Sequence, residues 1–498
     1  MKILLIKPQK TIPNKFRGVG GLYPSPALGY LAAILEKNGY EVKILDAAIE
    51  KWNQINKRGD GCSYIGMNFD EIAEVIRQEK PNVVGVTALS VDAYNAHLIA
   101  KTVKSVDKTI KVVVGGCHFT VRVEESLKDE NIDFVIVGEG EITIVELVKA
   151  LEENKPLEDV KGLVFKKNGK IIRNDPRPFN QDLDSLPFPA WHLLPMEKYF
   201  ELCKYLQGYL LIHERQFSII TSRSCPYACI FCSVRTIMGR GFRPRSPENV
   251  IEEMEQLIDK YKIKLLSIQD DNLTFDRKRA EKIFDLMIER GINKKIKWDT
   301  PNGLRADTLD EPLLRKMKES GAVHIYVSPE SGSQRVVNEI IGKKLDLNAV
   351  ENVVRICHKI NLKINLFFVI GLPGETKEDI QKTIKFANKM RELGAIPSYA
   401  IARPTFGTDL YKLCKEKGYL IKDDRDLEKT LLNSEDEGAI QTPEFTPEEL
   451  KKYAKMIRGK SEMESIMELL KTKPLYVLRL FLVRPIIILR YFFDRYIK

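Results

Sequence analysis

The hydrophobic positions of the first 155 residues form short, β-branched runs that alternate with amphipathic helical stretches. Short apolar runs separated by helices of this length predict a parallel, doubly wound, Rossmann-like sheet. The expected strands are 2–6, 41–45, 83–87, 111–114 and 134–137, and the expected helices are 27–38, 69–78 and 93–106.

A second alternation with longer units follows, and about six strand–helix pairs predict a partial (β/α)6 barrel of the TIM type. Its expected strands are 217–221, 264–269, 296–300, 323–328, 363–370 and 398–403, and its expected helices are 247–261, 277–290, 311–319, 347–360 and 377–393. The chemistry of such a barrel lies at the carboxyl ends of its strands.

The chain of 498 residues is therefore divided into an α/β domain at 1–155, a proline-rich linker at 156–210, a barrel at 211–418 and a helical region at 419–498. Asn168-Gly169 predicts a small hairpin in the linker. Thr446 and Glu449 are spaced as a capping box for a helix over 447–458, and Gly459 is its expected stop.

Three cysteines, Cys225, Cys229 and Cys232, lie at C-x3-C-x2-C spacing just after the first barrel strand. Thiolates are soft ligands, and three on one loop can hold three irons of a [4Fe–4S] cluster while the fourth iron stays open. A zinc knuckle or a purely structural cluster is the alternative. Zinc usually takes a fourth Cys or His at regular spacing, and His213 lies before the strand, so the open cluster is favoured.

The motif C-x3-C-x-Phe-C after a first strand resembles the signature of the radical S-adenosylmethionine (SAM) enzymes. The resemblance implies that the three cysteines ligate the cluster and that Phe231 lies near SAM. It also implies that the open iron chelates the amino and carboxylate groups of SAM, and that an electron cleaves SAM to methionine and a 5′-deoxyadenosyl radical.

Polar and glycine residues follow three other barrel strands, and the same resemblance gives them roles. It places Asp270 and Asp271 at the methionine end of SAM, and Glu330 and Ser331 toward its ribose or carboxylate. Gly371 begins a glycine-containing motif, through Glu375, that would lie against SAM. Each residue can instead cap a turn or a helix start, as Asp271 and Glu375 are placed to do.

The N-terminal segment resembles the cobalamin-binding (B12-binding) domain that precedes many radical SAM domains. The resemblance lies in 23–30, 85–90, 115–118 and 138–141. Ligands of doubly wound sheets bind at the carboxyl ends of strands, where small residues let a flat ligand approach. The residues expected there are Gly85, Thr87, Ser90, Gly115, Gly116 and Gly138.

The Asp-x-His-x-x-Gly motif that supplies an axial histidine in other cobalamin proteins is absent from the sequence. Cobalamin is therefore expected to bind without a protein histidine on cobalt, and His118 is expected to be a hydrogen-bonding loop residue. No G-x-G-x-x-G opens the first helix, which argues against a dinucleotide. A Rossmann-like module with another nucleotide or no cofactor remains the alternative.

Composition places the chain among ordinary globular proteins, with 44% hydrophobic and 30% charged residues. Eight cysteines, three of them in one loop, form no disulfide framework, so a reducing cytosol is predicted. The apolar run after Met1 is too short for a signal peptide. These features predict a cytoplasmic protein.

Most of the net charge of +10 lies in the tail from Lys471 to Lys498, which has seven basic residues and one acidic residue. No run of roughly 18 uncharged apolar residues is present, which disfavours a spanning helix. Arginines among Phe and Tyr suit peripheral contact with an anionic bilayer at the inner face of the cell membrane. A helix docked on the barrel is the other interpretation. Nucleic acid is not an expected partner, because the basic region is largely apolar.

The combined resemblance implies a cobalamin-dependent radical SAM C-methyltransferase that acts on an unactivated carbon. One SAM methylates the cobalamin, a second yields the radical, and a flavodoxin- or ferredoxin-type protein donates the electron. The tail points to a lipid or another membrane-resident substrate. The alternatives are oxidative cyclisation or rearrangement without methyl transfer, and a non-catalytic sensor that uses cobalamin and the cluster. Methylthio transfer to RNA is disfavoured.

Overall fold

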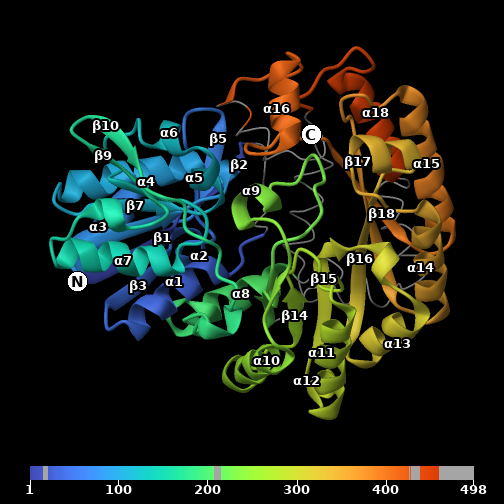
Figure 1. Cartoon of the computed structure of the whole chain (residues 1–498), viewed down its shortest axis with the longest axis horizontal. Coiled ribbons are helices and arrows are strands. Elements are labelled where there is room, and N and C mark those ends of the chain that lie inside the picture. Colours follow the sequence, from blue (N-terminus) through green and yellow to red (C-terminus); the bar gives the residue numbers. More distant parts are fainter. Residues whose placement is uncertain (15–20, 207–214, 425–426, 428–437, 459–498) are drawn as a thin grey trace.

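The computed structural model describes residues 1–14, 21–206, 215–424, 427 and 438–458. Two α/β units lie side by side, with the N-terminal unit on the left of Figure 1 and the barrel on the right. Helices α8 (Met196–Leu206) and α9 (Val234–Met238) lie between them. The predicted α/β class, with a doubly wound unit and a partial barrel, is confirmed.

The first unit is built on a seven-stranded sheet with the order β10-β9-β8-β7-β6-β1-β3. Its strands are β1 (Lys2–Lys7), β3 (Glu41–Asp46), β6 (Val83–Thr87), β7 (Lys111–Gly115), β8 (Phe134–Ile136), β9 (Leu163–Lys167) and β10 (Lys170–Arg173). The strands from β3 to β8 are parallel, and the strand order reverses between β1 and β6. Ligands of doubly wound sheets bind at this switch point.

Helices cover both faces of this sheet because its parallel strands are apolar on both sides. Helices α1 (Pro26–Lys37) and α7 (Glu141–Glu152) pack on one face. Helices α3 (Phe69–Glu79), α4 (Ala93–Val106) and α5 (Cys117–Val121) pack on the other. The predicted hairpin at Asn168-Gly169 is present, but its strands β9 and β10 extend this sheet antiparallel instead of standing in the linker.

A small antiparallel sheet of β2 (Lys10–Pro13), β4 (Ile55–Lys57) and β5 (Cys62–Ile65) was not predicted. A further helix of the first unit, α2 (Ala47–Glu50), follows β3, and α6 (Val123–Ser126) follows α5.

The barrel is a six-stranded, all-parallel sheet in sequence order. Its strands are β11 (Gln216–Ile219), β14 (Leu265–Ile268), β15 (Lys297–Leu304), β16 (Ala322–Glu330), β17 (Lys363–Ile370) and β18 (Ile396–Ile401). The helices of the barrel are α10 (Pro247–Tyr261), α11 (Arg277–Glu289), α12 (Ile292–Lys295), α13 (Glu311–Glu319), α14 (Leu347–Lys359), α15 (Lys377–Glu392) and α16 (Asp409–Glu416).

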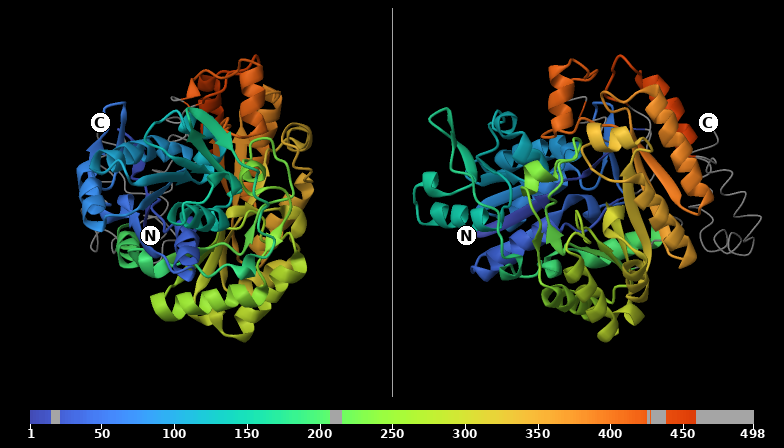
Figure 2. Two further views of the ribbon diagram at one scale, coloured as in Figure 1. Left: turned by 60° about the vertical axis from the view of Figure 1, so that its left-hand side comes forward. Right: turned by 45° about the vertical axis from the view of Figure 1, so that its right-hand side comes forward.

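The outer face of the barrel and helices α10 to α15 form the largest apolar core, which α8 extends to residues of the first unit, while α16 packs in smaller separate clusters. In the right-hand view of Figure 2, α15 and α18 (orange and red) lie on the side of the barrel that faces away from the first unit.

Helix α18 (Pro447–Arg458) packs on β18 and α15. Its predicted capping box is confirmed, because Glu449 N–H donates to Thr446 Oγ1 and Thr446 N–H donates to Glu449 Oε2. The tail from Lys471 to Lys498 and the stop at Gly459 lie outside the described residues. Within the described residues, no helix is long and apolar enough to cross a membrane.

Candidate active site at the junction of the two units

The cysteine loop lies between two short paired strands, β12 (Ser222–Arg223) and β13 (Arg243–Pro244), at the carboxyl end of β11. Cys225, Cys229 and Cys232 are free, half-buried thiols. Burial, followed by the charges of the nearby Cys229, Asp271 and Cys225, raises the pKa of Cys232 to about 11. The three thiols therefore lie near one another, on one side of the open end of the barrel.

The loop residues fit a cluster by their donor chemistry. Three thiols that are not in disulfides are the ligands that iron–sulfur clusters take, and ligation removes their protons. Asn272 Nδ2 lies 4.0 Å from Cys225 Sγ, as a hydrogen-bond donor to that sulfur. Among the described residues, no three His, Cys, Asp or Glu side chains stand close enough to hold a single metal ion, so the fit rests on the donor set and its placement.

Asp270 and Asp271, both predicted at the methionine end of SAM, differ in their surroundings. Asp270 is buried and accepts hydrogen bonds from Thr221 N (2.6 Å), Thr221 Oγ1 (2.5 Å) and Ser222 Oγ (2.6 Å). Its carboxylate therefore fixes the base of the cysteine loop. Asp271 accepts a hydrogen bond from the Ser224 N–H at 3.1 Å, and its charge raises the pKa of the Cys232 thiol. Burial, followed by the charge of Asp270, raises the pKa of Asp271 to about 6. Of the two, Asp271 is the carboxyl group that faces the loop.

Glu330 and Ser331 end β16 but point to different places. Glu330 has a left-handed backbone (φ +68°) and pairs with Lys343 Nζ at 2.7 Å, and both side chains are buried. The charge of Lys343 lowers the pKa of Cys229 and the charge of Glu330 raises it, so this ion pair lies beside the cysteine loop. Ser331 is fully buried and its hydroxyl lies 2.9 Å from Thr383 Oγ1 of α15. The fold therefore turns Ser331 to the outer helix, away from the predicted SAM position.

Position 371 requires glycine because α18 packs closely against it, and not because a ligand approaches the backbone there. Its φ is +87°, and a Cβ there would lie 2.5 Å from Leu450 of α18. Glu375 Oε2 accepts from the N–H groups of Gly371 (2.6 Å) and Leu372 (3.2 Å), so it closes its own turn. Phe231 is half-buried in an apolar cluster that includes Val369 and Leu372, at the ends of the last barrel strands.

The carboxyl edge of the first sheet carries the small residues predicted beside cobalamin. Gly116 (φ +90°) lies so close to Thr87 that a Cβ would be 2.4 Å from Thr87 Oγ1. Gly115 ends β7, and Gly138 N–H donates to Thr120 Oγ1 at 3.1 Å just after β8. Gly85 lies inside β6, where a Cβ would be 2.8 Å from Leu5, so it serves strand packing and not the edge. The edge therefore carries glycines and other small residues, which leave room for a flat ligand.

His118 is enclosed at this edge. Its Nδ1 lies 3.1 Å from Ser90 Oγ, and its ring packs against Phe119 and Phe406. Burial, and then the nearby His97 and Arg122, lowers the pKa of His118 to about 3, so the ring is neutral. Ser90 is occupied by this contact. This placement supports the prediction that His118 is a hydrogen-bonding residue and not a cobalt ligand.

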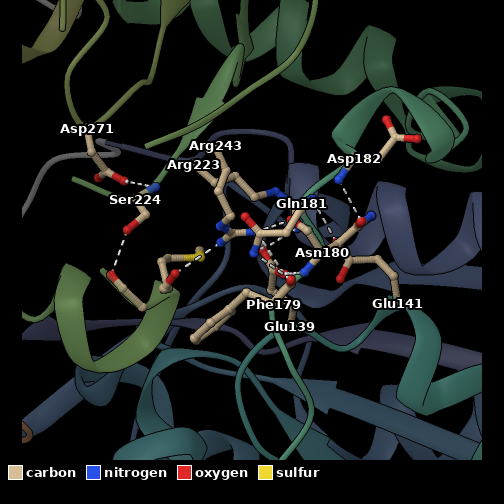
Figure 3. Close-up of polar contacts among 12 residues, drawn as sticks. Glu139, Glu141, Phe179, Asn180, Gln181, Asp182, Arg223, Ser224, Arg243 and Asp271 are labelled. Atoms are coloured by element: carbon tan, nitrogen blue, oxygen red, sulfur yellow. Dashed lines mark hydrogen bonds and ion pairs between the residues drawn. The ribbon is translucent and has the colours of Figure 1, made fainter. Parts of the chain in front are cut away.

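Sequence reasoning missed the ion pairs that join the two units (Figure 3). Arg223, two residues before Cys225, pairs with Glu139 (2.8 Å) and Glu141 (2.7 Å) after β8. Arg243 also pairs with Glu139 at 2.8 Å and donates to the carbonyl oxygen of Asn180. We call Glu139, Glu141, Arg223 and Arg243 the bridging cluster. The motif 138–141 was recognised, but nothing local in the sequence indicates its partners.

The bridging cluster and α5 bring the two predicted cofactor sites together. Helix α5 follows the Gly115-Gly116 turn and contacts α9, which follows the cysteine loop. Gly407, after β18, lies against Val121 at the end of α5. The glycine edge of the sheet and the cysteine loop therefore lie beside each other at the junction of the two units. Such an arrangement can hold two cofactors against one substrate.

Two family models match the chain. The radical SAM superfamily model matches residues 219–387, and the B12 binding domain model matches residues 17–148. The first match contains the cysteine loop and the second contains the glycine edge.

Relatives of known sequence match both units together. An uncharacterized methyltransferase of Pyrococcus horikoshii is 35% identical over 83% of this chain and 83% of its own length. Cytidylyl-2-hydroxyethylphosphonate methyltransferase of Streptomyces wedmorensis is 33% identical over 84% of this chain and 82% of its own. The anaerobic magnesium-protoporphyrin IX monomethyl ester cyclase of Cereibacter sphaeroides is 27% identical over 75% of this chain and 58% of its own.

Two solved structures share the fold. The radical SAM methyltransferase TsrM from Kitasatospora setae, with cobalamin and a [4Fe–4S] cluster bound, superposes with a TM-score of 0.65 at 18% identity, over 84% of this chain and 79% of that one. The cobalamin-dependent radical SAM enzyme OxsB superposes with a TM-score of 0.69 at 16% identity, over 91% of this chain and 65% of that one.

Proposed function

The chain belongs to the cobalamin-dependent radical SAM enzymes, and we propose that it is a C-methyltransferase acting on an unactivated carbon of a small molecule. The observation that carries the proposal is that the glycine edge and the cysteine loop lie beside each other at the junction, where the bridging cluster joins the two units. Two relatives above 30% identity that cover both units are named as methyltransferases, which favours methyl transfer.

The cofactors are a [4Fe–4S] cluster, SAM and cobalamin. When bound, they supply a hydrogen-abstracting radical and a methyl group. The proposed cluster ligands are Cys225, Cys229 and Cys232, and Asp270 fixes the backbone from which they project. Asp271 is the proposed contact for the amino end of SAM.

Apolar and cobalamin-side contacts complete this assignment. Phe231, which packs in an apolar cluster with Val369 and Leu372, is the proposed apolar contact for SAM. Thr87, Gly115, Gly116 and Gly138 are the proposed cobalamin contacts. The residues thus bind and orient the cofactors and exclude water from the space between them.

An oxidative cyclase is the second candidate, because the anaerobic cyclase relative matches three quarters of the chain. Both reactions begin with the same radical. They differ in whether the methyl group of SAM reaches the product.

SAM labelled with a trideuterated methyl group separates the candidates. We expect the reconstituted protein, incubated with reductant and a cell extract, to form 5′-deoxyadenosine and a small-molecule product heavier by one intact CD3 group. Mass spectrometry of both products is the measurement. Deoxyadenosine with an unlabelled, oxidised product would favour the cyclase, and no deoxyadenosine would refute both.

Histidine ligation of cobalt has its own test. We expect His118→Ala to leave the paramagnetic resonance spectrum of the cob(II)alamin form unchanged, because His118 Nδ1 is engaged with Ser90 and its ring is enclosed. Nitrogen hyperfine splitting in the wild type that disappears in the variant would contradict this expectation.

A flavodoxin- or ferredoxin-type protein is the proposed electron donor. The proposals of a lipid substrate and of peripheral membrane contact depend on the tail at 473–498, which the described residues do not include.

A further inference from the structure

The inner face of the barrel is polar where barrels of this type are usually filled with branched apolar side chains. Alternate residues of each strand point to opposite faces. Phe217, Leu266, Trp298, Ile325 and Leu366 face the outer helices and are buried in the apolar core. Their neighbours along the strands therefore face inward.

One layer of this inner face crosses four strands in direct register. Ser218 pairs with Ser267, Ser267 with Asp299, and Asp299 with His324. On β14 this layer lies three residues before Asp270, which places it about 10 Å deeper in the barrel. It is therefore separate from the residues proposed for the methionine end of SAM.

Two hydrogen-bond acceptors in this layer have no partner within the part of the chain that the structure describes. Asp299 is 7% exposed and His324 is 3% exposed. His324 Nε2 lies 2.7 Å from Asn365 Oδ1, an acceptor, so Nε2 carries the proton and Nδ1 carries a lone pair. Asp299 Oδ1 and His324 Nδ1 are buried and accept no hydrogen bond from the described residues. Leaving such groups unpaired destabilises a fold unless a ligand satisfies them.

Aromatic rings line the next positions of the inner face. The Tyr326 ring lies 4.4 Å from the His324 ring and is stacked on Phe367 at 5.3 Å. The Asp299 charge raises the pKa of both Tyr326 and Tyr23, so both tyrosines lie near Asp299. Tyr23 belongs to the first unit and is 52% exposed. Tyr326 and Phe367 are only half-buried, so solvent reaches this face.

We propose that Asp299 and His324 form a substrate subsite that binds a primary ammonium group, with Tyr326 and Phe367 against the adjoining carbon skeleton. A carboxylate and an imidazole lone pair both accept N–H hydrogen bonds, and aromatic faces attract a cation. The subsite rests on the proposed function and specifies its substrate class as an amine that carries an aromatic or apolar part.

The titratable groups near Asp299 are His324, Tyr326 and Tyr23, with Cys203 of α8 beside Tyr23 and Lys363 beside His324. No lysine or arginine pairs with Asp299 among the described residues, and burial raises its pKa to about 6. An ammonium ligand requires the ionised carboxylate. Binding is therefore strongest above pH 6 and weakens as the pH falls below it.

The test uses the full chain, reconstituted with its cofactors, and 2-phenylethylammonium as the probe in calorimetric titrations. We expect the wild type to bind the probe, and Asp299→Asn to bind it about 10–100-fold more weakly, as for loss of a charge-assisted hydrogen bond. His324→Gln should weaken binding by a smaller factor. Asp285→Asn on α11, which removes an outer-surface carboxylate, is the matched control and should bind as the wild type does.

Two readouts do not depend on how a variant folds. Wild-type affinity should fall about tenfold per pH unit below pH 6, because one proton competes with the ligand. The neutral probe 2-phenylethanol should bind weakly with no pH dependence. A wild type that does not bind the amine, or that binds it equally at pH 5 and pH 8, would overturn the subsite.

Formation of 5′-deoxyadenosine separates this proposal from the proposed function. We expect Asp299→Asn to bind SAM as tightly as the wild type does, because the Asp299 layer lies about 10 Å deeper in the barrel than Asp270. If the wild type fails to cleave SAM, the proposed function is wrong whatever the amine does. If Asp299→Asn binds SAM more weakly, Asp299 belongs to the SAM site and the subsite is refuted.

Discussion

Alanine at Cys225, Cys229 or Cys232 is expected to abolish the iron–sulfur cluster and all SAM cleavage. Each thiol supplies one of three ligands on a single loop, and two thiols cannot hold a cube whose fourth iron is already open. Iron and sulfide content, the visible charge-transfer absorbance and 5′-deoxyadenosine formation would be measured on each reconstituted variant. We expect at least about 10³-fold loss of cleavage, since no other group supplies the radical.

Cys117→Ala and Cys203→Ala are the matched controls, because these thiols are free and half-buried like the three loop cysteines. They should keep the full cluster and at least half of the activity. If either were as necessary as the loop cysteines, or if a loop variant kept its cluster, the ligand assignment would be wrong.

The fold could be predicted wherever the apolar pattern is regular. The strands Val83–Thr87 and Lys363–Ile370 and the helices Ala93–Val106 and Pro247–Tyr261 have the bounds that the sequence predicts. The sheet of β2, β4 and β5 was missed because its strands are short, and β4 is mostly polar and exposed. The hairpin was found from Asn168-Gly169, but its pairing with β8 is a long-range choice that local sequence does not encode.

The candidate site also has parts that the local sequence predicts and parts that it does not. Cysteine spacing and the glycine turns are local signals, and the structure places them at one junction. Asp270, Ser331 and Gly371 carry the same residue types that a ligand site needs, yet they hydrogen-bond or pack within the fold. The Arg223 and Glu139 partnership spans 84 positions in the sequence, so only the assembled fold reveals it.

Arg223→Met is expected to be the most destabilising substitution at the junction. The four side chains of the bridging cluster are at most 12% exposed. Among the described residues, removing the guanidinium leaves Glu141 with no ion-pair partner, and Glu139 with Arg243 and the Asn180 N–H. Breaking a buried ion pair from one side costs about 3–5 kcal/mol. For a cooperative unit of about 150–250 residues, this lowers the thermal midpoint by roughly 6–20 °C. Differential scanning calorimetry is the measurement.

The control for this prediction is a solvent-exposed ion pair of the same residue types on the protein surface. Arg173 pairs with Glu124, and their side chains are 49% and 60% exposed. Arg173→Met should change stability by no more than about 1 kcal/mol, because solvent screens surface pairs. Arg223→Met combined with Glu141→Gln should recover part of the loss, since Glu139 keeps its pairing with Arg243 and no uncompensated carboxylate then stays buried. Equal midpoints for Arg223→Met and Arg173→Met would show that the bridging cluster does not hold the two units together.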